Sequence, residues 1–238
     1  FVFKLRRPPT STLFPAPPLC RSPSQELWEA SEEILAIIAS ESPELLEFSQ
    51  CYLQAPLLDG QQEWCETFDR GRATSLLLFE HVHAESRDRG QAMVDLMAQY
   101  QAAGLQPDCR ELPDYLPVYL EYLSLCPEED GRQGLQDIAE ILALLGGRLT
   151  QRDSGYHVLF DQLLHLADSP LRSHTVLEKI AGESRDDTPQ AMDALWEEEQ
   201  VKFIDDTACN NAANQQYRQR FREQVTPQYL DLSAGGVK

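Results

Sequence analysis

The sequence lacks the short motifs that mark several large classes of protein. Its 238 residues contain no C-x-x-C pair, and its six cysteines do not cluster as they do in a disulfide framework or a zinc site. The frames G-x-S-x-G, H-E-x-x-H and G-x-x-x-x-G-K-[ST] are also missing. We therefore expect reduced thiols in a cytoplasmic protein that binds no metal or permanent cofactor and is not an enzyme.

Basic residues and long apolar runs are scarce as well. Acidic residues outnumber basic ones by 39 to 20, which gives a formal net charge of −19. The negative electrostatic field of such a charge repels nucleic acid and anionic lipid but attracts a basic peptide. The longest run of large apolar residues, Leu76 to Phe79, is far shorter than the roughly 20 residues that a membrane-spanning helix needs. The expected partner is a basic segment of another protein, with no nucleic acid bound and no insertion into a membrane.

Apolar residues recur at helical spacing along most of the chain, without a run of alternating β-branched residues or a hairpin signature. Capping residues, prolines and glycines place the ends of the expected helices. These helices begin after Ser24, after Ser42 and Pro43, and after Ser86 with an end at Gly104, and then cover 135–145 with an end at Gly146 and Gly147, 159–166, and 190–203. The pattern predicts an all-α fold, a single-domain helical bundle.

Composition divides the chain into three parts. Residues 1–24 contain six prolines and four basic residues but no acidic one, so we expect an irregular, Pro-rich, basic arm. Residues 25–206 carry the helical pattern and are expected to form one domain. Residues 207–238 are polar, and we expect a partly mobile C-terminal tail.

His81 and His83 are the first candidates for a metal or catalytic site. On a helix, residues two apart point about 200° away from each other, so the two imidazoles can share an ion only if the segment is extended. The preceding residues, Asp69 to Arg72, are interpreted as a turn that caps a helical segment over 73–83. A nucleotide- or metal-dependent enzyme that uses His81 and His83, and a permanent scaffold subunit, are the alternatives to a protein that holds another polypeptide.

Two prolines bracket an aspartate in the segment Glu111 to Pro117, just before another apolar stripe. Asp114 is predicted to be the N-cap of that helix and to accept a hydrogen bond from the amide of Leu116. Pro117 then falls in the first helical turn, where its missing N–H is harmless.

Five stretches of the chain carry a resemblance to a known family. They are 68–83, 85–93, 111–123, 187–191 and 196–203. In these stretches the chain resembles the respiratory nitrate reductase δ-subunit chaperones of the NarJ/NarW family, from about Leu27 to the C-terminus. The wider TorD-like group of maturation chaperones carries an acidic residue, proline, aspartate and histidine before a helix. Here Glu111, Pro113 and Asp114 match that pattern, while Tyr115 stands at the histidine position, which is more similar to the NarW branch.

The resemblance implies a system-specific chaperone with the TorD-like helical bundle. Such a chaperone binds the apo form of the catalytic α-subunit of nitrate reductase, alone or with the β-subunit, including the N-terminal segment of the α-subunit. It assists insertion of the molybdenum guanine dinucleotide cofactor before membrane attachment and does not keep the cofactor. Residues 1–22 depart from the family pattern, and our hypothesis for them is a reading-frame change or a wrong start assignment.

The resemblance and the acidic charge together predict a peptide groove around the Glu111 segment. Aromatic residues line it and acidic residues form its rim, although a core position is the competing interpretation for each aromatic. The predicted client-binding residues are Asp69, Arg72, Phe79, Glu80, His83, Glu111, Pro113, Asp114, Tyr115, Tyr119 and Tyr122.

Overall fold

The computed structural model describes residues 19–82, 87–105, 111–194 and 197. The chain divides into two compact units, one ending at Thr188 and the other beginning at Pro189. In the second unit residues 189–194 are helical, which agrees with the start of the helix predicted over 190–203. The predicted tail and residues 1–18 of the predicted arm lie outside the described residues, so the domain boundaries at 24 and 206 remain predictions.

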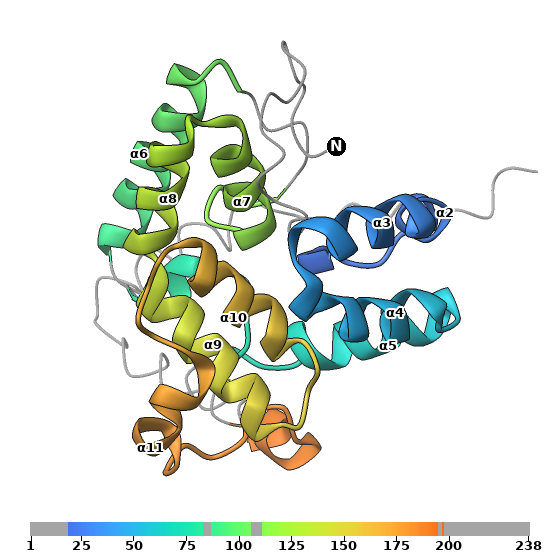
Figure 1. Ribbon diagram of the computed structural model, residues 1–238. Coiled ribbons are helices and arrows are strands. Elements are labelled where there is room, and N and C mark those ends of the chain that lie inside the picture. Colours follow the sequence, from blue (N-terminus) through green and yellow to red (C-terminus); the bar gives the residue numbers. More distant parts are fainter. Residues whose placement is uncertain (1–18, 83–86, 106–110, 195–196, 198–238) are drawn as a thin grey trace, which may run out of the picture. The chain divides into compact units, whose positions relative to one another are not determined.

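The described part of the first unit consists of helices and contains no strand, which confirms the all-α prediction (Figure 1). One isolated antiparallel bridge joins Leu77 to Tyr115. None of the described helices is long and apolar enough to cross a bilayer. The elements are α2 (Gln25–Glu29), α3 (Ser31–Glu41), η1 (Pro43–Leu45), α4 (Leu46–Gln54), α5 (Leu57–Phe68), η2 (Leu78–Glu80), α6 (Arg87–Ala102), α7 (Leu116–Leu125), α8 (Glu128–Asp137), α9 (Ala139–Gln151), α10 (His157–Leu166), η3 (Ser173–Val176) and α11 (Leu177–Ile180).

The centre of the core is the pair α9 and α10, which lie side by side (Figure 1). On α9, Leu142, Leu145 and Leu149 recur at three- and four-residue spacing, and all three are fully buried. Leu159 and Leu163 repeat this spacing on α10. Burying each of these side chains contributes roughly 1.5–3 kcal/mol to folding. Around this pair, α8 packs against α7 and η3 packs against α9.

The helix end predicted at Gly146 and Gly147 is wrong, because α9 continues to Gln151. A Cβ at Gly146 would collide with the hydroxyl of Ser173, and a Cβ at Gly147 would collide with the side chain of Val176. The two glycines therefore allow η3 to approach the backbone of α9 closely, and they do not stop the helix.

The predicted helix over 73–83 is also wrong, since in the described part of this stretch, residues 73–82, only η2, a single 3-10 turn, forms. The backbone of this stretch bonds to a distant segment instead. Leu116 N donates to Leu76 O (2.8 Å), and Leu78 N donates to Asp114 O (2.9 Å). These two bonds replace the local bonds that a helix would make.

Several smaller predictions are confirmed. Ser24 is the N-cap of α2 and accepts from Leu27 N (3.3 Å). Gly104, just after α6, has a φ of 78°, which is the left-handed conformation expected of a helix stop.

The sequence did not lead us to expect α5, which buries Trp64 and Phe68. Leu19 and Cys20, the last residues before Arg21 in the predicted arm, are buried in the core.

Candidate functional site

The backbone pairing between residues 76–79 and 113–116 sorts their side chains onto two faces. One face is turned to the core and is almost fully buried; it consists of Leu76, Leu78, Asp114 and Leu116. The alternate residues Leu77, Phe79, Pro113 and Tyr115 are half-buried. The alternation is centred on the bridge between Leu77 and Tyr115, whose backbones are extended, while Leu78 already begins η2 and Leu116 begins α7. We call these four half-buried residues the outer face.

Acidic groups lie close to the outer face. The pKa of Tyr115 is raised above its usual range, first by burial and then by the charge of Glu111, with a smaller contribution from Asp69. Arg21 acts in the opposite direction. Glu111 and Asp69 are both exposed, so the phenol of Tyr115 lies within electrostatic range of two solvated carboxylates. The structure thus brings together three of the predicted client-binding residues.

Exposed apolar side chains flank the same region. Leu112, next to Pro113, is 41% exposed, and Val82, three residues after Phe79, is 60% exposed. Glu80, beside Phe79, is half-buried. An apolar surface with carboxylates near it suits a basic amphipathic segment, which buries its apolar side and pairs its cations with the acids.

Asp114 does not cap α7, so that prediction is wrong. The N-cap is Tyr115, and the amide of Leu116 is already bonded to Leu76 O. The carboxylate of Asp114 is fully buried, and its Oδ2 accepts from Phe79 N (3.1 Å). Asp114 therefore joins the two paired segments from inside and does not form part of an exposed rim. Pro117 does fall in the first turn of α7, as predicted.

Arg89, on α6, is a contributor that the sequence reasoning missed. Its guanidinium lies 3.8 Å from the carboxylate of Asp114 and 3.6 Å from that of Glu80. Among the described residues, neither Arg89 Nε nor Asp114 Oδ1, both buried, has a hydrogen-bond partner. The stretch 85–93, which carries part of the family resemblance, was the available signal for this residue.

The buried charge of Asp114 predicts a pH effect on stability. Burial raises the pKa of Asp114, while the Phe79 amide and then Arg89 oppose this. When the pKa of a carboxyl is higher in the folded protein than in the unfolded chain, the group's contribution to the free energy of unfolding is full below the unfolded-state pKa. That contribution is lost as pH rises through the folded-state pKa. Relative to Asp114→Asn, the wild type is therefore expected to lose stability as pH rises from the ordinary aspartate range. Urea unfolding of both proteins across about pH 3.5–7 measures this, and a flat or opposite difference contradicts it.

Two of the predicted aromatic residues point elsewhere. Tyr119 is 9% exposed, and its hydroxyl donates to Gly134 O on α8 (3.2 Å), so it belongs to the core. Tyr122 is half-buried, and its ring packs on Tyr100 of α6 with centroids 4.9 Å apart. Neither residue belongs to the outer face. Tyr119 occupies a core position, which was the alternative to a place in the groove.

Of the two histidines proposed as an alternative site, only His81 lies within the described residues. His81 Nε2 donates to Ser75 O (2.8 Å), and the pKa of His81 is lowered, mainly by burial. His83 lies outside the described residues. Among the residues that are described, no group of three or more His, Cys, Asp or Glu side chains is placed to hold a metal ion. Arg72, also predicted for the client site, is exposed on the loop after α5.

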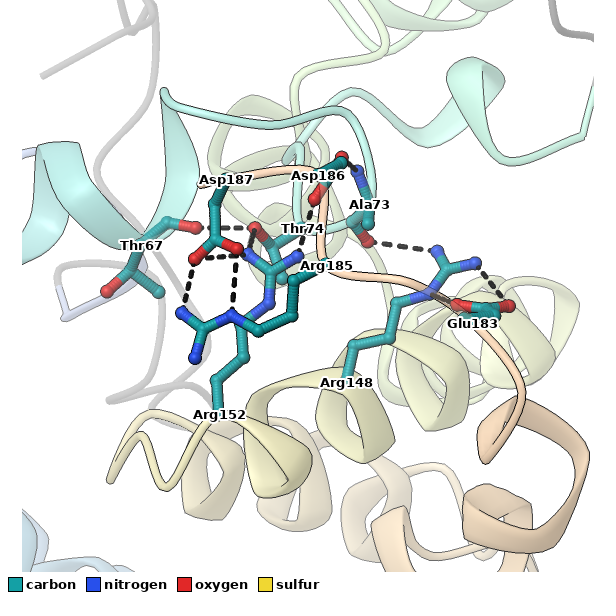
Figure 2. A network of polar contacts seen from close by, with 9 residues as sticks. All are labelled: Thr67, Ala73, Thr74, Arg148, Arg152, Glu183, Arg185, Asp186 and Asp187. Atoms are coloured by element: carbon teal, nitrogen blue, oxygen red, sulfur yellow. Dashed lines mark hydrogen bonds and ion pairs between the residues drawn. The ribbon is translucent and has the colours of Figure 1, made fainter. Parts of the chain in front are cut away.

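A second set of polar contacts ties α9 to two loops (Figure 2). Arg152, just after α9, donates to Asp186 Oδ1 (2.7 Å) and to Thr74 Oγ1 (3.0 Å), and it pairs with Asp187 (3.6 Å). Arg148 donates twice to Glu183, at 2.7 and 3.0 Å. We call Arg148, Arg152, Glu183, Asp186 and Asp187 the clasp. The sequence reasoning missed it.

Two carboxylates of the clasp are held ionised. The hydrogen bond from Arg148 lowers the pKa of Glu183. The pKa of Asp187 is lowered first by its hydrogen bond from Arg185, with Arg152 contributing. Groups with a lowered pKa stabilise the fold above their ordinary pKa, and this stabilisation is lost as pH falls through the lowered value. Both carboxylates therefore stabilise the fold at neutral pH, and acidification is needed to remove this contribution.

Comparison with known proteins identifies the family. The family model described as "Nitrate reductase delta subunit" matches residues 25–162. The chain is 60% identical over 222 residues to "Probable nitrate reductase molybdenum cofactor assembly chaperone NarW" of Escherichia coli K12, covering 92% of this chain and 96% of that protein. It is 53% identical over 225 residues to the E. coli K12 chaperone NarJ, covering 92% and 95%. A Bacillus subtilis relative, also named as a probable NarJ, is 30% identical over 121 residues, 51% of this chain and 64% of that protein.

These matches confirm the resemblance seen in the sequence. The relatives are described as assembly chaperones, which agrees with the prediction that the protein is not an enzyme. The four cysteines within the described residues, Cys20, Cys51, Cys65 and Cys126, are free thiols. From its match to the family model and to two chaperones along nearly their whole length, the chain belongs to the nitrate reductase delta subunit family.

Proposed function

We propose that this protein is an assembly chaperone for a respiratory nitrate reductase. It binds the apo form of the catalytic α-subunit, including the N-terminal segment, in the cytoplasm. It holds that subunit until the molybdenum guanine dinucleotide cofactor has been inserted, and the complex attaches to the membrane only afterwards. The observation that carries the proposal is the identity of 60% and 53% to two molybdenum cofactor assembly chaperones, along 96% and 95% of their lengths.

The outer face supports binding of a basic client segment. Its apolar side chains offer a surface for the apolar side of a helix or strand, and Asp69, Glu80 and Glu111 supply negative charge beside it. The net charge of −19 also speeds the encounter with a positively charged segment at low salt. We therefore propose that the client binds to the outer face and to these three carboxylates.

A chaperone of this kind works by differential affinity. A protein that binds the apo client more tightly than the finished client stabilises the apo state by a free energy that grows with the logarithm of its free concentration over its Kd. Insertion of the cofactor changes the client, and the loss of affinity then releases the chaperone. The molybdenum cofactor is cargo in this scheme, and the residues of this chain need only hold the polypeptide that receives it.

Titration of a synthetic peptide tests the proposal directly. A peptide with the sequence of the α-subunit N-terminus is expected to bind with a Kd of about 1 μM or lower in calorimetry at low salt. Affinity should fall as salt is raised, because the attraction between exposed charges is screened. A matched peptide in which every Lys and Arg is replaced by Gln should bind much more weakly.

Two results of this titration oppose the proposal. Absence of binding at low ionic strength means that the N-terminal segment is not the client element. Equal binding of the neutral peptide means that the acidic side chains do not recognise it. A cellular assay is independent of the peptide: in a strain without its own assembly chaperones, this protein should restore the molybdenum content of the reductase.

A further inference from the structure

The clasp lies beside the candidate client site without being part of it, and we propose that Arg148 and Arg152 are positioning residues for client binding. They hold the loop 71–75 against α9 and the strap 183–187, and that loop fixes the segment 76–82, which carries half of the outer face. The inference rests on the proposed function for its binding readout, and its structural readout is independent of it.

The first step is that the clasp holds the loop 71–75 by hydrogen bonds (Figure 2). Ala73 is held at both of its backbone groups: its N–H donates to Asp186 Oδ2 (2.7 Å), and its carbonyl accepts from Arg148 Nη1 (2.9 Å). Thr74 is held by Arg152, and its own hydroxyl also donates to Thr67 O, at the end of α5. Two successive residues of the loop are thereby fixed to the clasp.

The second step carries this restraint to the outer face. Ser75 follows directly and is bonded to two residues of the next segment. Its carbonyl accepts from His81 Nε2 (2.8 Å), and its hydroxyl accepts from Leu77 N (3.2 Å). Leu77 is the bridge partner of Tyr115, and Phe79 N donates to Asp114. The path from Arg152 to the outer face therefore consists of the hydrogen bond to Thr74, the peptide bond to Ser75 and the hydrogen bond from Leu77 to Ser75.

The geometry requires arginine. The side chain of Arg152 is 9% exposed and that of Arg148 16% exposed, so each guanidinium must satisfy most of its donors within the protein. Each reaches two or three acceptors on different segments at once, which suits a planar guanidinium and not a single ammonium group. A lysine can keep one of these partners but not all of them.

Gly71 allows the clasp to be opened without a change of charge. A Cβ at Gly71 would lie 2.6–2.7 Å from the carboxylate atoms of Asp186, so Gly71→Ala pushes this carboxylate away from Ala73 and Arg152. Gly182, just before the strap, is its matched control, because a Cβ added at Gly182 would meet nothing within 4 Å. For the charge-changing variant Arg152→Gln, the control is Arg132→Gln, because Arg132 is also paired with two carboxylates, those of Glu128 and Asp168.

The experiment measures hydrogen exchange and peptide affinity on the full chain. In Gly71→Ala and Arg152→Gln, amide exchange is expected to speed up at Ala73 and also at Leu78 and Phe79. The Kd for the α-subunit N-terminal peptide should rise about tenfold, a typical size for coupling through a packed network. Arg152→Lys should fall between the wild type and Arg152→Gln, and both control variants, Gly182→Ala and Arg132→Gln, should match the wild type.

The outcomes separate this inference from the proposed function. If exchange rises at Ala73 but stays unchanged at Leu78 and Phe79, the clasp does not position the outer face, whether or not the peptide binds. If the wild type binds the peptide and both clasp variants bind it equally well, the inference is likewise overturned. If the wild type fails to bind while exchange spreads to Phe79, the proposed client fails and the positioning stands.

Discussion

Replacing Gly146 with valine is expected to destabilise the protein by about 3 kcal/mol, the upper part of the range for overpacked cores. A Cβ at this position collides with the Ser173 hydroxyl and lies 3.2 Å from Phe160 Cβ. Ser173 cannot withdraw cheaply, because both its N–H and its hydroxyl donate to Asp161 Oδ1, at 2.7 and 2.9 Å. Valine must therefore push η3 away from α9. Urea unfolding followed by circular dichroism measures the loss.

Gly90 provides the control for this substitution. It lies within α6, and a Cβ there would have nothing within 4 Å. Gly90→Ala is expected to stabilise the protein by about 0.5–1 kcal/mol, because alanine loses less conformational entropy in a helix. A Gly146→Val variant as stable as the wild type would show that η3 does not pack on this turn of α9.

The comparison of Gly146 with Gly104 explains why sequence patterns predicted most of the helices correctly but misplaced one of their ends. A glycine after an apolar stripe has two common uses, as a helix stop and as a point of close approach. Gly104 has the first use, and Gly146 the second. Nothing near Gly146 in the sequence distinguishes them, because its neighbour Ser173 is 27 residues away (173 − 146).

Local rules also misplaced the role of Asp114. An aspartate just before a proline-containing helix start is a good N-cap candidate, and the rule placed the beginning of α7 to within one residue. The amide that it was expected to cap is bonded to Leu76, which lies 40 residues earlier (116 − 76). The family resemblance, in contrast, selected Phe79, Glu111 and Tyr115 without any knowledge of the pairing that brings residues 76–79 and 113–116 together.

The clasp could not be predicted from local patterns for the same reason. Its contacts join Ala73 to Arg148 and to Asp186, which are 75 and 113 residues away. The adjacent carboxylates of Asp186 and Asp187 are typical of a solvated acidic turn, and Arg148 and Arg152 are typical of cations near a helix C-terminus. Only the fold shows that these common patterns meet.

The second large effect is expected at the acids beside the outer face. A double variant, Asp69→Lys with Glu111→Lys, should weaken binding of the α-subunit N-terminal peptide by about 3 kcal/mol, or roughly a hundredfold at low salt, because two attractive charges become repulsive. Both side chains are exposed, so the stability of the fold should change little. Calorimetry at two ionic strengths measures the loss, which should shrink as salt is raised.

The control for this variant separates local charge from total charge. Glu140, on α9, and Glu178, on α11, are also exposed, and reversing both changes the net charge by the same amount. If the acids beside Tyr115 contact the client, the first double variant should lose much more affinity than Glu140→Lys with Glu178→Lys. Equal losses would mean that binding of the client depends only on the net charge of the protein. The outer face would then not be the client-binding surface. A larger loss at Asp69 and Glu111 that persists in part at high salt would place the cations of the client in direct contact with these two carboxylates.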